Sequence, residues 1–323
     1  MYIVTGGAGF IGSAFVWKLN QEGIDDILIV DALGTSDKWK NLVKKRYADF
    51  IHKDAFYEML CEGRLPFKTK AVIHMGACSS TTERDADYLM ENNFHYSCAL
   101  ARWAVARKIP FIYASSAATY GDGSLGFSDA DRTTPALQPI NMYGYSKQLF
   151  DLWVIRNKLL GKVTGIKFFN VFGPNEYHKG EMRSVVHKSF GQIRQTGKVQ
   201  LFKSHREGFG HGEQVRDFVY VKDCVEVMWW LLKHPKARGI FNLGTGRART
   251  WNDLVSAVFK ASGVKPDIEY IDMPLEIRDQ YQYVTEAKMD KLRKTGCPVK
   301  CRSLEDAIED YVKGHLQQKD PYL

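Results

Sequence analysis

The chain has 323 residues, of which 45% are hydrophobic and 25% charged, and a formal net charge of +8. This length can bury a large core, which suggests one large domain or two closely packed ones. The basic residues are spread along the chain, so we expect no nucleic-acid partner; they would suit a cleft for a polyanion such as a nucleotide diphosphate. No stretch approaches the ~20 apolar residues that cross a bilayer, and Met1 leads directly into a predicted strand without a signal peptide, so we expect a cytoplasmic protein with no membrane partner.

The cysteines do not indicate a metal site. They are scattered, none forms a C-x-x-C pair, and no histidine cluster accompanies them. We therefore expect reduced structural thiols and no bound metal. The six positions are Cys61, Cys78, Cys98, Cys224, Cys297 and Cys301.

The first dozen residues predict a strand, a glycine-rich turn and a helix that opens at Phe10. The glycines fit G-x-G-x-x-G, as Gly7, Gly9 and Gly12, and also G-x-x-G-x-x-G, as Gly6, Gly9 and Gly12. Glycine allows the sharp turn, the close approach of bare backbone to a pyrophosphate, and the packing of helix on strand. The helix N-terminus then presents free N–H groups to the phosphates. This pattern predicts a dinucleotide site.

The following residues strengthen that interpretation over an ordinary glycine-rich turn. A second apolar run at 26–30 ends in Asp31, about where dinucleotide-binding proteins carry the acid that meets the adenosine ribose. Strand and helix patterns then alternate, which predicts a doubly wound parallel sheet of the Rossmann type, covered on both faces. Further strands are expected at 71–74 and 110–116, and serines stand at the carboxyl end of the second, the edge where ligands bind in such sheets.

The alternation changes beyond about residue 165. Residues 166–169 read as a strand, whereas residues 170–180 read as a loop. Three later apolar runs read as strands that rejoin the main sheet: residues 217–220, 240–243 and 281–284. We expect an NADP-binding domain and a smaller α/β substrate-binding cap. The first would comprise residues 1–169 with returning segments at about 217–246 and 282–297, and the second residues 170–216, 247–281 and 298–323.

A catalytic group is predicted where Tyr143 and Lys147 stand four residues apart on a helical pattern, since that spacing places them on one face. A free phenol has a pKa near ~10 and is a poor base at neutral pH. A nearby ammonium and an oxidised nicotinamide ring would favour the phenolate and lower this pKa. The phenolate could then take a proton from a sugar hydroxyl while hydride leaves the carbon, with Ser116 bonded to the same oxygen.

Together, the glycine turn, Ser116, the Tyr143/Lys147 pair and the run at 216–221 resemble the extended short-chain dehydrogenases/reductases that act on nucleotide sugars. Four longer runs are more specific, and over essentially the whole chain they resemble the ADP-L-glycero-D-manno-heptose 6-epimerase family. These runs are residues 76–83, 113–121, 178–180 and 241–248.

The resemblance implies an enzyme that inverts C6 of an ADP-heptose, a precursor of the lipopolysaccharide inner core, and that assembles as a homo-oligomer. Transient oxidation gives a ketone. The ketone then presents its other face to the cofactor, and the same hydride returns to that face. Chemistry on two faces of one carbon calls for two acid/base groups. Tyr143 would serve one face, and Lys179, in the His-Lys-Gly run, matches the family's second acid/base residue.

The resemblance also implies the binding residues. The cofactor positions are Gly6, Gly9, Phe10, Ile11, Gly12, Asp31, Ala32, Lys38, Lys53, Met75, Gly76, Ala77, Cys78, Ser79, Asn92, Lys147, Val171 and Lys179. The substrate positions are Ser116, Asn170, Glu181, Lys188, Phe202, Arg216 and Tyr281. Asp31 favours the unphosphorylated ribose of NAD, whereas Lys38 and Lys53 could accept a 2′-phosphate. The resemblance implies NADP as the cofactor, because the family generally uses it, with NAD as the alternative.

Three other functions remain to be weighed. A nucleotide-sugar 4-epimerase would share every feature except the heptose-specific runs. A 4,6-dehydratase needs an acid/base carboxylate pair beside the catalytic hydroxyl, whereas Ala117 and Ala118 follow Ser116 here. A non-catalytic NADP-sensing protein could use the same fold, because a fold alone does not establish a function. The presence of both Tyr143 and Lys147 argues against this last alternative.

Overall fold

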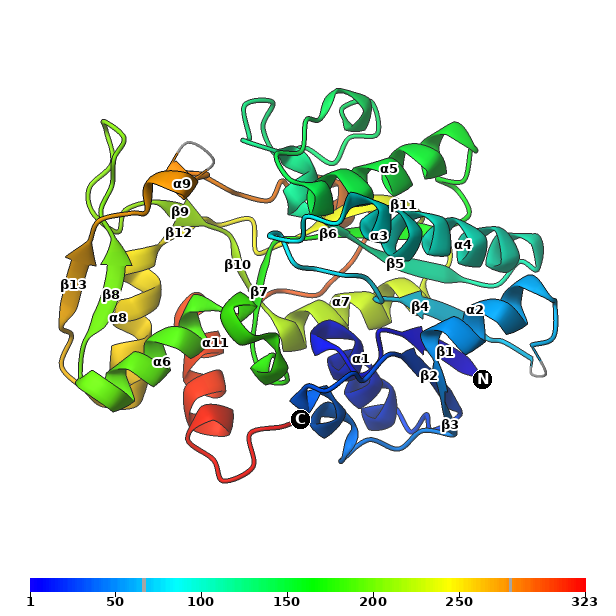
Figure 1. The fold of residues 1–323 in the computed structure, drawn as a ribbon, viewed down its shortest axis with the longest axis horizontal. Coiled ribbons are helices and arrows are strands. Elements are labelled where there is room, and N and C mark those ends of the chain that lie inside the picture. Colours follow the sequence, from blue (N-terminus) through cyan, green and yellow to red (C-terminus); the bar gives the residue numbers. More distant parts are fainter. Residues whose placement is uncertain (66–67, 279–280) are drawn as a thin grey trace.

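The computed structural model describes residues 1–65, 68–278 and 281–323. Its centre is a seven-stranded parallel sheet in the order β11-β6-β5-β4-β1-β2-β3 (Figure 1). The strands are β1 (Tyr2–Thr5), β2 (Ile27–Asp31), β3 (Asp49–His52), β4 (Ala71–His74), β5 (Phe111–Ser116), β6 (Thr164–Phe168) and β11 (Gly239–Leu243). The strand order reverses beside β1, so the predicted doubly wound Rossmann class is confirmed.

Helices cover both faces of this sheet. Side chains of a strand alternate between its faces, and in β1 the side chain of Val4 packs in one core while that of Ile3 packs in the other. One face is covered by α1 (Phe10–Gln21) and α7 (Val221–Lys233). The opposite face is covered by α2 (Lys53–Cys61), α3 (Ala86–Leu89), α4 (Tyr96–Ala106) and α5 (Met142–Arg156) (Figure 1).

The second half of the chain adds a smaller layer beside the carboxyl edge of the sheet, on the left in Figure 1. Its α8 (Trp251–Ser262) begins at a capping box of Thr250 and Asp253 and ends at Gly263, which adopts the left-handed conformation. The other elements are α6 (Val185–Thr196), β8 (Val199–Phe202), β9 (Val215–Arg216), β12 (Arg249–Thr250), β13 (Ile268–Ile271), α9 (Leu275–Arg278) and α11 (Leu304–Tyr311), whereas α10 (Asp290–Lys294) packs against β11 of the main sheet.

Two predicted strands do not rejoin the main sheet. Only the run at 240–243 does so, as β11. The run at 217–220 forms β10 (Phe218–Tyr220), which pairs with β7 (Asn170–Phe172) in a separate two-stranded sheet. Residues 281–284 form no strand, and only a bridge joins Val284 to Val215. These predictions were wrong because runs of three or four apolar residues make too few ladder hydrogen bonds to specify their partner.

The segment at 170–180, predicted as a loop, also carries regular structure. It contains β7 and the start of a short 3₁₀ helix, η5 (Tyr177–Met182). A second 3₁₀ helix, η1 (Asp37–Leu42), follows β2 and packs against η5, the helix that carries Lys179.

A buried histidine braces the strand ends beneath the glycine-rich turn. The ring of His74 is bonded to Thr5 Oγ1 at 2.6 Å and to Ser97 Oγ at 2.8 Å. Burial lowers the pKa of His74 to about 3, so the imidazole is neutral at physiological pH. It therefore ties β1, β4 and α4 together without adding a charge under the site.

Among the described residues, the helices are all too short or too polar to cross a bilayer. The six cysteines are free thiols. Within the same part of the chain, no three His, Cys, Asp or Glu side chains are grouped so that they could hold a metal ion.

Candidate active site

The glycine-rich turn has the geometry of a dinucleotide cradle. Gly6 has φ +66°, and a Cβ there would lie 2.6 Å from the backbone nitrogen of Gly76. A Cβ at Gly12 would lie 2.0 Å from the carbonyl oxygen of Gly6. No side chain caps the N-terminus of α1, which leaves its first N–H groups available to an anion. The backbone at this turn therefore fits the pyrophosphate of a nicotinamide dinucleotide.

A cavity of about 570 Å³ extends from this turn along the carboxyl edge of the sheet. The ends of β1, β4 and β5 form its floor, and α5 and η5 contribute its walls. It gathers most of the predicted cofactor and catalytic residues: Gly6, Gly9, Phe10, Ile11, Gly12, Asp31, Ala32, Lys38, Met75, Gly76, Ala77, Cys78, Ser79, Ser116, Tyr143, Lys147, Val171 and Lys179.

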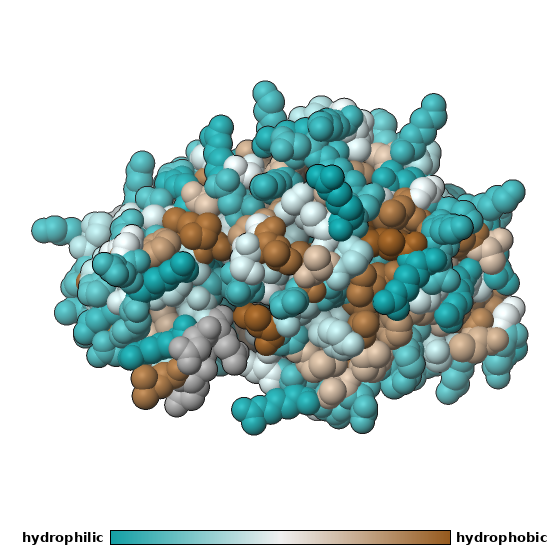
Figure 2. Space-filling view, turned by 90° about the horizontal axis from the view of Figure 1, so that it is seen from above, coloured by the Kyte–Doolittle hydropathy of each residue, from teal (hydrophilic) through white to brown (hydrophobic). Residues whose placement is uncertain are grey.

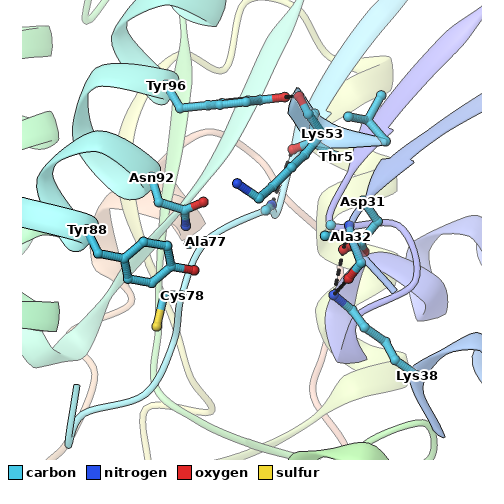
Figure 3. Close-up of a pocket in the computed structure, with 13 residues that line it drawn as sticks. Thr5, Asp31, Ala32, Lys38, Lys53, Ala77, Cys78, Tyr88, Asn92 and Tyr96 are labelled. Atoms are coloured by element: carbon cyan, nitrogen blue, oxygen red, sulfur yellow. Dashed lines mark hydrogen bonds and ion pairs between the residues drawn. The ribbon is translucent and has the colours of Figure 1, made fainter. Parts of the chain in front are cut away.

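A smaller cavity of about 190 Å³ adjoins the first and is lined by Lys53 and Asn92 as well as by Asp31 and Lys38. Figure 3 shows the Lys53 amino group reaching toward Asn92, whereas the Lys38 amino group is turned to Asp31. Asp31 accepts hydrogen bonds from the backbone N–H groups of Ala8 and Ala32, and its Oδ1 lies 2.5 Å from Lys38 Nζ. Its charge is therefore already engaged by the turn and by Lys38.

The catalytic pair is positioned by the first turn of α5. Asn141 caps this helix by accepting a hydrogen bond from the Gly144 N–H, and the helix therefore begins one residue before Tyr143. Lys147 lies one turn further, and its Nζ donates to the Ala114 carbonyl at the end of β5. Burial lowers the pKa of Lys147 to about 8, although Asp151 acts in the opposite direction.

The phenol of Tyr143 is buried in this structure. We expected a nearby ammonium together with an oxidised nicotinamide ring to lower its pKa, and burial of the residue acts in the opposite direction by raising it. The Ser116 hydroxyl, which hydrogen-bonds the phenol, acts in the opposite direction without outweighing burial. Activation of this phenol therefore depends on the positive charge that an oxidised nicotinamide ring supplies when bound.

A buried ion pair helps to fix the position of the catalytic residues of α5. Asp151, one turn beyond Lys147, lies 2.9 Å from Lys167 Nζ of β6, and both side chains are fully buried. Its carboxylate also accepts hydrogen bonds from the hydroxyls of Tyr113 and Ser115 on β5. This network joins α5 to β5 and β6 and so fixes the position of Lys147 above the strand ends.

The second predicted acid/base residue reaches the same cavity from a different element. Lys179 lies in η5, and its Nζ is 5.5 Å from the centre of the Phe10 ring in the first turn of α1. Burial lowers the pKa of Lys179, and the nearby carboxylate of Glu176 acts in the opposite direction. Tyr143 and Lys179 thus line one cavity from α5 and η5.

A separate, largely apolar cavity of about 310 Å³ gathers three predicted substrate residues, Lys188, Phe202 and Tyr281. The sequence analysis missed Trp251, which lines the same cavity from the start of α8. Arg216 is buried beside it, with its guanidinium 5.1 Å from the Tyr281 ring centre and 5.7 Å from that of Trp251. The neighbouring Asp217 instead bonds the backbone N–H groups of residues 245, 246 and 287, so it does not pair with Arg216.

Besides Arg216, two predicted substrate residues lie outside these cavities. Asn170 is exposed on β7, and Glu181 is 93% exposed and 3.2 Å from Lys188 Nζ. Conversely, Tyr88 and Tyr96 line the smaller cofactor cavity without having been predicted. Only the helical spacing of eight residues between these tyrosines could have indicated that both face the same side.

With this geometry in view, the family can be stated. The chain belongs to the NAD dependent epimerase/dehydratase family, whose model matches residues 2–244. Over 323 residues and the full length of both chains, it is 61% identical to the ADP-L-glycero-D-manno-heptose-6-epimerase of Nitratidesulfovibrio vulgaris. This similarity confirms the resemblance to heptose epimerases inferred from the motifs.

Solved structures agree with this assignment. The ADP-L-glycero-D-manno-heptose-6-epimerase of Helicobacter pylori superposes with a TM-score of 0.81 at 27% identity, over 97% of this chain and 95% of that one. The UDP-glucose 4-epimerase of Thermus thermophilus, solved in complex with NAD, superposes with a TM-score of 0.75 at 25% identity, over 97% of each chain.

Proposed function

We propose that this protein interconverts ADP-D-glycero-β-D-manno-heptose and ADP-L-glycero-β-D-manno-heptose by transient oxidation at C6. The observation that carries this proposal is the placement of two protonatable side chains, Tyr143 and Lys179, in one cavity beside the dinucleotide cradle. The 61% identical relative with the same heptose-epimerase name supports the choice of substrate. A bound nicotinamide would accept the C6 hydride and return it.

The protein's own residues would manage the proton at the C6 oxygen. Tyr143 takes the proton as the hydroxyl becomes a ketone, and Ser116 donates a hydrogen bond to that oxygen throughout. Lys147, held against the Ala114 carbonyl, provides positive charge near Tyr143 and the cofactor ribose. After the ketone turns, Lys179 serves the other face as the second acid/base group.

The apolar cavity between α6, β8 and α8 would hold the adenine of the substrate. Aromatic side chains at Phe202, Trp251 and Tyr281 offer faces on which a base can stack. Arg216 stands at the border of this cavity, and its planar fork fits two oxygens of a diphosphate. The sugar would then extend toward Tyr143 and Lys179.

NADP is the cofactor that the ribose cavity favours. An aspartate selects NAD by accepting a bond from the free 2′-hydroxyl, but Asp31 is engaged by Ala8, Ala32 and Lys38. Lys38 and Lys53 both line this cavity and offer two amino groups to a 2′-phosphate, which would compete with Asp31 for Lys38 and with Asp54, 2.9 Å from Lys53 Nζ, for Lys53. These two lysines are the support for NADP over NAD.

Replacing Lys53 by alanine tests this preference. One charge-assisted hydrogen bond to the 2′-phosphate contributes about 1.5–3 kcal/mol, so NADP should bind about 10- to 100-fold more weakly. The affinity for NAD should stay unchanged. Titration with NADPH and with NADH, followed by the fluorescence of the reduced nicotinamide, measures the two affinities, and Lys70→Ala, a substitution of an exposed lysine outside the cavity, is the control. Equal weakening of both cofactors would contradict the preference.

The substrate is tested by incubating purified protein with ADP-D-glycero-D-manno-heptose without added cofactor and following the C6 configuration by NMR. A mixture of the two epimers is expected, because cofactor that copurifies is regenerated in each cycle. If neither epimer is converted, even with NADP or NAD added, the proposed substrate is wrong. A panel of UDP-, GDP- and dTDP-sugars would then test the 4-epimerase alternative.

We also propose that the product supplies heptose for the lipopolysaccharide core and that the protein forms a homo-oligomer. Figure 2 looks onto the side of the molecule that carries α4 and α5, where apolar side chains interrupt the hydrophilic surface. Separately from the brown residues of that view, α4 and α5 carry aromatic rings that are not fully buried: Tyr145 is 45% exposed, and Trp103 and Trp153 are partly buried. Burial of these rings against a second copy would remove apolar area from water.

A further inference from the structure

Asn175, four residues before Lys179, has an unusual conformation and a fully engaged side chain. Its φ of +76° lies in the left-handed region, and the residue is completely buried. The side-chain Nδ2 donates to Ser13 Oγ at 2.9 Å, and Oδ1 accepts from the Leu323 N–H at 3.1 Å. One side chain thus joins the first helix of the dinucleotide site to the last residues of the chain.

Residues 320–323 form a segment that is held against the base of the Lys179 loop. The Tyr177 hydroxyl donates to the Pro321 carbonyl at 2.9 Å, and its ring meets the Tyr322 ring edge-on at 5.0 Å. From the other side, Lys44 Nζ lies 2.8 Å from Asp320 Oδ2. Figure 1 shows the C-terminal end of the chain running from α11 back to the dinucleotide-binding half.

A third contact completes the cluster. The buried Asn41 of η1 donates from Nδ2 to the Ala8 carbonyl at 2.9 Å and to the Asn175 carbonyl at 3.1 Å, and it lies 3.2 Å from His178 Nδ1. Ala8 belongs to the glycine-rich turn, and His178 precedes Lys179. The same cluster therefore touches both the turn that would carry the cofactor and the loop that carries Lys179.

We infer that Asn175 and the 320–323 segment are positioning elements that hold the Lys179 amino group at the cofactor cavity. Lys179 sits in a single 3₁₀ turn followed at once by Gly180, whose φ is +54°, and so short a turn has little stability of its own. Its position is set by contacts with η1 and with residues 320–323, and by Glu176, whose buried carboxylate accepts hydrogen bonds from Ser184 and Tyr311. This inference rests on the proposed function, because that function gives Lys179 its role.

The position of Lys179 matters more to one half of the reaction than to the other. Tyr143 belongs to α5, which the Asp151 network joins to the sheet independently of η5. Loosening the Lys179 loop should therefore slow the oxidation of the epimer that Lys179 deprotonates and leave the oxidation of the other epimer intact. A displacement of about 1 Å can cost on the order of 100-fold in rate.

The variant Asn175→Gly tests the inference directly. Glycine adopts the left-handed backbone without strain, so the change removes the two side-chain hydrogen bonds and keeps the turn. Lys158→Gly is the matched control, because Lys158 also has a left-handed φ, of +55°, but is exposed and remote from the cavity. Tyr177→Phe, which keeps the ring and removes the hydroxyl that bonds Pro321 and Tyr311, is a milder second variant should Asn175→Gly fail to fold.

Two measurements are made on each variant. Hydrogen–deuterium exchange of residues 177–182 requires no substrate and should accelerate in Asn175→Gly and Tyr177→Phe but not in Lys158→Gly. Single-turnover mixing of the enzyme and oxidised cofactor with each purified ADP-heptose epimer follows the absorbance of reduced nicotinamide. In Asn175→Gly, one epimer should be oxidised about 10- to 100-fold more slowly, and the other at the rate of the unmodified protein.

The outcomes separate this inference from the function on which it rests. If the unmodified protein reduces its cofactor with neither epimer, the proposed function fails, whatever the exchange data show. If it reduces the cofactor with both epimers and Asn175→Gly slows the two oxidations equally, the cluster is only structural and the inference is overturned. Unchanged exchange in residues 177–182 would overturn it as well.

Discussion

Replacing Tyr143 by phenylalanine should lower the rate of epimerisation by about 10²- to 10⁴-fold, the usual contribution of a positioned acid/base group. The substitution removes one hydroxyl and preserves the ring, so packing in the first turn of α5 should be unaffected. Without the hydroxyl, no group on this face can take the proton as hydride leaves C6. The rate is measured by NMR of the C6 configuration from either epimer.

The neighbouring Tyr145 provides a matched control for this prediction. It lies on the same helix and receives the same substitution, but its ring is 45% exposed and does not line the cavity. Tyr145→Phe should therefore retain full turnover. Cofactor affinity should be unchanged in both variants, since the glycine turn and the ribose cavity are untouched. Full turnover by Tyr143→Phe with normal cofactor binding would refute the proposed mechanism.

The dinucleotide-binding half could be predicted in detail because its signals are local. Gly12 is required by its contact with the carbonyl of Gly6, and Gly6 by its own left-handed φ of +66°. The spacing of Tyr143 and Lys147 is a property of one helix, whose start is set by Asn141. Short-range requirements of this kind can be recognised in the sequence, and β1, α1 and β2 were found where they were expected.

The remainder depended on contacts between distant segments. The partner of β10 is a three-residue strand, β7, and nothing in either run distinguishes it from a strand of the main sheet. The edge strand β3 alternates poorly because it is largely exposed, so it was not predicted. The aromatic cavity for the substrate base likewise brings together α6, β8 and α8, and Trp251 could be assigned to it only from the fold.

The pKa of Tyr143 shows a similar limit. Helical spacing predicted that Tyr143 and Lys147 share a face, and both line one cavity, but the spacing says nothing of burial, which raises the pKa of Tyr143 and lowers that of Lys147. Desolvation depends on everything that packs around the pair, including β5 and the end of β4. Because both groups are buried, the charge of a bound oxidised nicotinamide ring would have a large effect on the pKa of Tyr143.

Replacing Lys179 by methionine should also lower the rate of epimerisation by about 10²- to 10⁴-fold. The variant should differ from Tyr143→Phe in which epimer it can still oxidise. Methionine retains an unbranched apolar side chain that can still pack near Phe10, so only the amino group is lost. With Tyr143 intact, one epimer should still be oxidised and reduce the cofactor. The ketone can then return only to the epimer from which it came.

Single-turnover mixing distinguishes this result from general damage. In Lys179→Met, one ADP-heptose epimer should reduce the cofactor at the normal rate and the other should not. Tyr143→Phe should show the opposite preference, since it serves the other face. Lys40→Met is the control, because Lys40 lies on the neighbouring η1, outside the cavity, and pairs with Asp37 at 3.0 Å.

A loss of both oxidations in Lys179→Met would mean that Lys179 binds the substrate or cofactor and does not act as a separate acid/base group. A single residue would then have to serve both faces of C6, and Tyr143 is the phenol placed to do so. Opposite epimer preferences in the two variants would instead assign one face of the carbon to each side chain. The double variant should then oxidise neither epimer, although the intact glycine turn still binds the cofactor.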